Sequence, residues 1–174
     1  FIENDLGIPL DREVTILWDG ITRTKVNSIN GDFSGTFVLP FDTIAGNHTL
    51  TALINDQNFL RGSSDDTEIL VIRETEITLQ WLGGFRNASS VVSGYLRDVV
   101  GVGLSGHQLD VYFDGQYVGN ATSGESGMFV YDVFIDKETE LGTHAVMVSF
   151  EGSYFYLPSD KSSSSEILAH TSFV

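Results

Sequence analysis

The chain has no cysteine and only three prolines among its 174 residues. The lack of cysteine excludes disulfides, thiolate metal sites and cysteine nucleophiles. No apolar run approaches the ~20 residues of a membrane-spanning helix, so we expect no direct membrane insertion. Basic residues are scarce: 9 Lys and Arg stand against 24 Asp and Glu, which gives a net charge of −15. Such a surface repels phosphate groups, and we therefore expect no nucleic-acid partner.

The first residues, FIENDLGIPL, contain neither a methionine nor a basic-then-apolar leader. We therefore expect the sequence to be part of a longer chain. Its 41% hydrophobic content is enough to build a packed interior.

Apolar and polar residues alternate along most of the sequence. EVTILWDG (13–20) and QLDVYFDG (108–115) place apolar side chains on one face and end in Asp-Gly, the pattern of a strand entering a tight turn. The same period of two occurs in DFSGTFVL, HTLTALI, TEILVI, TEITLQWL, SVVSGYL, MFVYDVFI and HAVMVSF. No segment has a convincing helical period. The sequence therefore predicts an all-β protein.

The strand pattern occurs twice along the chain, as an internal repeat. Gly7, Asp19-Gly20, Phe33, Gly46-x-His48 and Glu68-Ile69-Leu70 reappear as Gly101, Asp114-Gly115, Phe129, Gly142-x-His144 and Glu166-Ile167-Leu168. The offset between the copies grows from 94 to 98 residues, which indicates small insertions in turns with strand order kept. We predict two tandem immunoglobulin-like Greek-key β-sandwiches, over residues 1–73 and 74–174, joined by the short linker IRETEI.

The two copies differ at their start. TEITLQWLGGFRNASSVVSGYLRD precedes Gly101, whereas only FIEND precedes the equivalent turn at Gly7. We therefore expect the first sandwich to lack its N-terminal strand, which either upstream sequence or another molecule supplies. Its edge should be open to strand addition, and we predict dimerisation or strand exchange through it.

The segments LGIPLDREVTILWDG, NGDFSGTF and AGNHTLTALINDQNFLRGSS, with their second copies, resemble the Ig-like repeats of large bacterial and archaeal surface proteins. The resemblance covers nearly the whole chain twice and departs from the family pattern where Gly103 stands in place of Pro9. It implies an extracellular or cell-surface tandem module. The family has no catalytic residues to transfer.

Few side chains suggest chemistry. His48 and His144 are repeat equivalents without a metal-ligand spacing, so we expect them to be structural, covering a sandwich end or donating to a turn carbonyl. Asp65 and Asp66 are the best candidates for calcium ligands. We favour the alternative that they are charged loop residues exposed to solvent, and we expect no cofactor. Three glycosylation sequons occur, at Asn47, Asn87 and Asn120. No catalytic motif is present, and we expect no enzyme activity.

The inward phase of each strand predicts the two interiors. In the first copy it selects Val14, Ile16, Trp18, Phe33, Phe37, Leu39, Leu50, Ala52 and Ile69. In the second it selects Leu79, Trp81, Val92, Leu109, Val111, Phe113, Phe129, Val133, Val146, Val148 and Ile167. Phe59, Tyr154 and Phe155 are expected at the sandwich ends.

Two functions fit these observations. The favoured one is a non-catalytic spacer or stalk of a larger extracellular or surface-anchored protein, with other domains of that chain, proteins or polysaccharides as partners. The alternative is an accessory or carbohydrate-binding module beside a surface peptidase, transglutaminase-like enzyme or glycosidase. A binding module should show an exposed aromatic patch or a polar groove.

Overall fold

A computed structural model describes residues 1–170, and the chain forms two compact units, Phe1–Val71 (unit 1) and Ile72–Val174 (unit 2). The boundary lies two residues before the one expected from the sequence, because Arg73 is bound into unit 2. Its N–H donates to the Phe155 carbonyl (2.9 Å), and its own carbonyl accepts from the N–H of Leu157 (2.8 Å).

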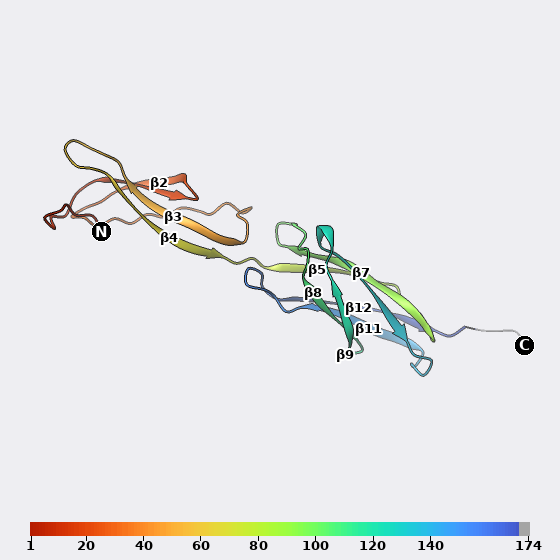
Figure 1. The fold of residues 1–174 in the computed structure, drawn as a ribbon. Coiled ribbons are helices and arrows are strands. Elements are labelled where there is room, and N and C mark those ends of the chain that lie inside the picture. Colours follow the sequence, from red (N-terminus) through yellow and green to blue (C-terminus); the bar gives the residue numbers. More distant parts are fainter. Residues whose placement is uncertain (171–174) are drawn as a thin grey trace, which may run out of the picture. The chain divides into compact units, whose positions relative to one another are not determined.

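Unit 2 is a sandwich of two sheets (Figure 1). Its strands are β5 (Thr75–Trp81), β6 (Gly84–Phe85), β7 (Ala88–Asp98), β8 (Gln108–Phe113), β9 (Gln116–Thr122), β10 (Met128–Ile135), β11 (Gly142–Phe150) and β12 (Ser159–Leu168). One sheet has the order β10-β7-β5 and the other β6-β12-β11-β8-β9, with a single 3₁₀ turn at Glu125–Gly127. The predicted all-β fold class is confirmed, and unit 2 forms a β-sandwich as predicted.

The interior of unit 2 comes from the inward phase of both sheets. Ten of the fully or nearly fully buried side chains are Ile77, Trp81, Val92, Leu96, Leu109, Val111, Phe129, Ile135, Val146 and Ile167. The predicted interior residues all contribute, although Leu79 and Phe113 are only partly buried. Period-two alternation predicts this core well because a sheet covers each apolar face.

Unit 1 contains one sheet of four strands in the order β2-β1-β3-β4 (Figure 1). The strands are β1 (Glu13–Trp18), β2 (Ile21–Asn27), β3 (Gly46–Ile54) and β4 (Ser63–Val71). They are the repeat equivalents of β8, β9, β11 and β12. The predicted strand DFSGTFVL (32–39) is wrong: Asp32 makes only an isolated bridge with Ile29, and residues 33–39 form no ladder with any described residue. Its equivalent, β10, is a strand because β7 pairs along its whole length.

The interior of unit 1 is correspondingly open. Val14 and Trp18 are buried as predicted, but Leu39 and Ile69 are 37% and 36% exposed, whereas their equivalents Ile135 and Ile167 are fully buried. Ile16, Phe33, Phe37, Leu50 and Ala52 are half-buried. These predictions fail because no second sheet covers the apolar face among the described residues of unit 1.

The predicted end-packing aromatics differ from one another. Phe59 is fully exposed at the tip of the β3–β4 connection, and Tyr154 is largely exposed, so both predictions are wrong. Phe155 is half-buried and contacts the Tyr154 ring edge to face. Within residues 1–170 there is no helix with the length and hydropathy needed to cross a membrane.

Candidate functional site: a repeated aspartate–histidine pair

Each unit carries an aspartate–histidine pair at the turn of a hairpin that lies at one edge of its sheet. The aspartate opens the Asp-Gly turn between β1 and β2, or between β8 and β9. Both turn residues have positive φ, 49° and 76° at Asp19-Gly20 and 46° and 78° at Asp114-Gly115. This backbone is the type I′ turn for which Asp-Gly is a strong signal.

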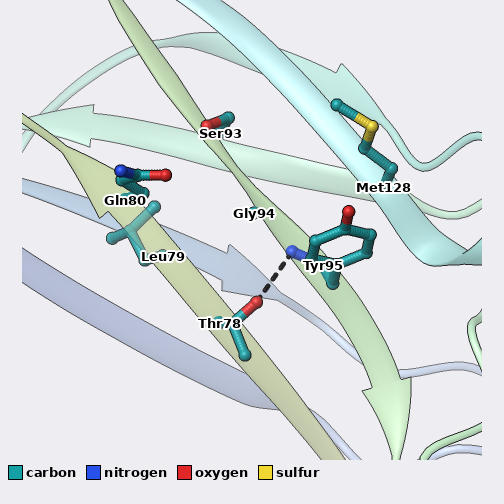
Figure 2. Close-up of a pocket in the computed structure, with 7 residues that line it drawn as sticks. All are labelled: Thr78, Leu79, Gln80, Ser93, Gly94, Tyr95 and Met128. Carbon is teal, nitrogen blue, oxygen red and sulfur yellow. Dashed lines mark hydrogen bonds between the residues drawn. The ribbon is translucent and has the colours of Figure 1, made fainter.

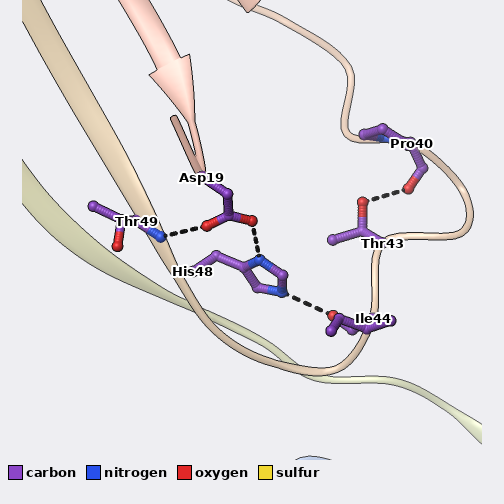
Figure 3. Close-up of polar contacts among 6 residues, drawn as sticks. All are labelled: Asp19, Pro40, Thr43, Ile44, His48 and Thr49. Carbon is purple, nitrogen blue, oxygen red and sulfur yellow. Dashed lines mark hydrogen bonds and ion pairs between the residues drawn. The ribbon is translucent and has the colours of Figure 1, made fainter. Parts of the chain in front are cut away.

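The pair in unit 1 ties this turn to the start of β3 (Figure 3). The Nδ1 of His48 lies 2.6 Å from the Asp19 Oδ2, and its Nε2 lies 2.9 Å from the Ile44 carbonyl. The second oxygen of Asp19 accepts the N–H of Thr49 at 2.9 Å.

Unit 2 repeats the arrangement with the same spacings. His144 contacts Asp114 at 2.6 Å and the Glu140 carbonyl at 2.9 Å, and the N–H of Ala145 donates to Asp114 at 2.9 Å. Each histidine also stacks on an aromatic ring: His48 on Trp18 (4.9 Å between centroids) and His144 on Phe113 (5.4 Å).

The hydrogen-bond partners of both histidines favour the protonated ring. A carboxylate and a carbonyl oxygen can only accept, so each ring nitrogen must carry a hydrogen to bond both partners. The hydrogen bond to Asp19 raises the pKa of His48 above its usual 6.5, and the bond to the Ile44 carbonyl adds to this. The hydrogen bond to Asp114 likewise raises the pKa of His144, against the opposing effect of burial.

The aspartates shift in the opposite direction. Hydrogen bonds from His48 and from the N–H of Thr49 lower the pKa of Asp19. Burial acts to raise the pKa of Asp114, but the hydrogen bonds from Ala145 and His144 outweigh it, and the pKa falls below its usual value.

This arrangement suits a structural tie and does not suit catalysis. A general base needs a ring nitrogen free to take a proton from substrate. The second nitrogen of His48 and of His144 is instead bound to a backbone carbonyl. The predicted donation to a turn carbonyl is confirmed, whereas the aspartate partner was missed. The signal for it was present: the Asp-Gly and Gly-x-His motifs recur together in both copies.

The three sequon asparagines are all exposed. Asn47 lies in β3, Asn120 lies in β9, and Asn87 lies in the turn before β7 with φ 57°. Their glycosylation stays a prediction.

The calcium candidates do not converge. Asp65 and Asp66 are consecutive residues of β4, and consecutive strand side chains point to opposite faces. No group of three or more His, Asp or Glu able to hold a metal occurs among residues 1–170. That the protein uses no cofactor stays a prediction.

A shallow hollow lies on the outer face of the β10-β7-β5 sheet (Figure 2). It has a volume of about 340 Å³ and is lined by Thr78, Leu79, Gln80, Ser93, Gly94, Tyr95 and Met128. The Arg97 guanidinium lies 4.4 Å from the centroid of the Tyr95 ring. The hollow thus has no acid or base in its lining, and its one aromatic ring already has a cation as partner.

No family model matches the chain, and no curated protein matches its sequence. Similar solved structures include a 1.5-MDa bacterial ice-binding adhesin studied for host cell surface retention (12% identity, 95% of this chain, 55% of that chain, TM-score 0.40). A second is domains 4 and 5 of the S-layer protein SbsC (10% identity, 89% of this chain, 99% of that chain, TM-score 0.36). A third is a Parabacteroides merdae β-glucuronidase (14% identity, 88% of this chain, 21% of that chain, TM-score 0.34). The chain spans about half the length of the adhesin chain. At these identities the likenesses concern the fold and assign no activity, ligand or partner.

Proposed function

We propose that the chain is a non-catalytic spacer or stalk segment of a larger extracellular or surface-anchored protein, whose immediate partners are other domains of that protein. The observation that carries the proposal is a parallel clamp in unit 2, in which the segment leading into β5 pairs with the segment leading into β12, and β6 pairs with β12 itself.

The clamp has two parts, one before the start of β5 and β12 and one near the end of β12. At one end, Arg73 exchanges two backbone hydrogen bonds with Phe155 and Leu157, and the Thr75 hydroxyl bonds the Leu157 carbonyl at 2.9 Å. At the other end, β6 pairs in parallel with β12, with Gly84 opposite Ile167 and Phe85 opposite Leu168.

A parallel clamp is the arrangement that resists tension along the chain. Force enters unit 2 at the start of β5 and leaves at the end of β12. Because these strands run in the same direction, the force slides them past each other and loads all the clamp bonds at once. An antiparallel terminal pair would instead open one bond at a time.

Other features of the surface support a spacer over a carbohydrate-binding module. Both tryptophans, Trp18 and Trp81, are buried, so neither offers a ring for sugar stacking. The aspartate–histidine pairs are consumed by internal hydrogen bonds. Exposed apolar side chains on the outer faces of β7 and β10, namely Val91, Val130 and Phe134, leave room for protein contacts in an adhesive role.

Single-molecule pulling of unit 2 within the whole chain tests the proposal. The chain has no cysteine, so introduced cysteine pairs can attach the handles. Handles at Ile72 and Ala169 load the clamp in shear, whereas handles at Ile72 and Ser153 pull the same strands apart from one end.

We expect a clearly higher unfolding force in the shear geometry, because the clamp bonds must break together. Equal forces in the two geometries would show that the clamp gives no mechanical resistance, and would contradict the spacer function.

A further inference from the structure

The uncovered face of unit 1 is defined by comparison with unit 2. Leu39 and Ile69 are more than a third exposed, and Phe33 is half-buried, although their equivalents Ile135, Ile167 and Phe129 are buried. A hollow of about 130 Å³ lies on this face, lined by Phe1, Ile2, Val14, Phe33, Ala52, Ile54, Ser63, Ser64 and Asp65.

A turn at the start of unit 1 shows which residues of the two units are equivalent. The Asn4 Oδ1 accepts the N–H groups of Leu6 and Ile8 at 3.0 and 2.9 Å. In unit 2 the Asp98 Oδ1 accepts the N–H groups of Val100 and Val102 at 3.1 and 2.9 Å. The two turns are the same structure at an offset of 94 residues, so Phe1 corresponds to Tyr95 and Ile2 to Leu96.

Unit 2 shows what covers the equivalent face. Residues 88–94 of β7 pair one by one with Phe129–Ile135 of β10, and β5 lies against β12. In unit 1 the backbone of residues 33–39, the equivalent of Phe129–Ile135, forms no ladder with any described residue. Backbone without ladder partners beside an apolar face is a template for strand addition.

We propose that this face of unit 1 is the acceptor for a two-stranded β-hairpin of the repeat's own type, equivalent to Thr75–Gly94. The second strand of the hairpin pairs with residues 33–39, and its first strand covers Ile69 of β4. This inference rests on the fold alone and is independent of the proposed spacer function.

The hairpin has one steric requirement in addition to its apolar alternation. Gly94 pairs with Phe129, and a Cβ at Gly94 would lie 2.8 Å from the Phe129 ring and 1.9 Å from the Thr78 carbonyl. Phe33 occupies the equivalent position in unit 1. We therefore expect glycine at this position of the hairpin, mainly because the carbonyl of its own first strand leaves no room for a Cβ, and also because an aromatic ring lies opposite.

The register permits a direct test. A copy of residues 75–94 placed immediately before Phe1 of the whole chain, with no added linker, puts its last glycine opposite Phe33. Two matched variants of the added copy serve as controls. Val92→Asp changes a position that is buried in unit 2, and Val91→Asp changes its neighbour, which is 56% exposed.

Hydrogen exchange of the amides in residues 33–39 is the readout. We expect the alternate amides that face the added strand to be slowed at least tenfold in the fused chain and in its Val91→Asp variant, but not in its Val92→Asp variant. Sedimentation of the unfused chain gives its oligomeric state in parallel.

Two results overturn the proposal. If these amides exchange as fast in the fused chain as in the unfused one, the face does not accept the hairpin. If the unfused chain is already a dimer with residues 33–39 protected, a second copy is the occupant. A failure in the pulling experiment on unit 2 would leave both results unaffected.

Discussion

Replacing the isoleucine at equivalent positions of the two units should have very different costs. Ile167 of β12 is fully buried between two sheets, and Ile69 of β4 is 36% exposed on the uncovered sheet. Ile→Ala in a closed core removes transfer free energy and leaves a cavity, at a cost of about 2–5 kcal/mol. At Ile69 part of the side chain is already in water and no closed cavity forms, so we expect about 1 kcal/mol.

The two tryptophans allow each unit to be followed separately. Trp18 lies in unit 1 and Trp81 in unit 2, and the chain has no other tryptophan. Urea unfolding monitored by fluorescence in a Trp18→Phe background reports unit 2, and in a Trp81→Phe background reports unit 1. A loss of stability for Ile69→Ala as large as that for Ile167→Ala would show that Ile69 lies in a closed core, contrary to the exposure of its side chain.

Three further predictions follow from local geometry. Because the pKa of His144 is raised in the folded state, its contribution to the stability of unit 2 is complete below about pH 6.5 and is lost as the pH rises through the folded-state pKa. The contribution of Asp114, whose pKa is lowered, is lost as the pH falls through its folded-state pKa. Urea unfolding midpoints of unit 2 measured against pH should show both losses, and His144→Gln should remove most of the loss at high pH. Gly94→Ala should unfold unit 2 or lower its free energy of unfolding, measured by calorimetry, by about 3 kcal/mol or more, because the new Cβ would lie 1.9 Å from the Thr78 carbonyl. As a control, Gly124→Ala should lower it by about 1 kcal/mol or less, because the nearest atom to its new Cβ lies 3.5 Å away. A chelator should leave the melting temperature unchanged, since no acidic cluster converges among residues 1–170; a fall in melting temperature would instead point to a bound cation.

The positions of the strands are predicted from the sequence more accurately than the burial of their side chains. Alternation shows which face of a strand is apolar, and in unit 2 that face is the buried one. The same alternation selects Leu39 and Ile69 in unit 1, where both are exposed. Burial depends on a second sheet, which is a property of tertiary structure that no single strand encodes. The absence of the predicted strand at residues 32–39 has the same cause, since an isolated edge strand has no partner for its backbone.

The sequence predicts the structural role of the two histidines but not their aspartate partners. Duplication of His48 as His144 indicates a structural role, and the turn carbonyl as acceptor is confirmed. The link to Asp19 and Asp114 joins residues about 30 positions apart, and only the pairing of β1 with β3 and of β8 with β11 brings them together. Their joint recurrence was the available clue.

Hydrogen exchange of the unmodified chain compares equivalent backbone of the two units in one experiment, and so tests whether unit 2 is closed and clamped while unit 1 has an uncovered face. We expect slow exchange for the alternate amides of Phe129–Ile135 that face β7, and for the clamp amides of Arg73 and Leu157. We expect fast exchange throughout residues 33–39. Equal protection of both segments in a monomeric chain would show that unit 1 is also closed, and fast exchange at Arg73 and Leu157 would show that the clamp does not hold.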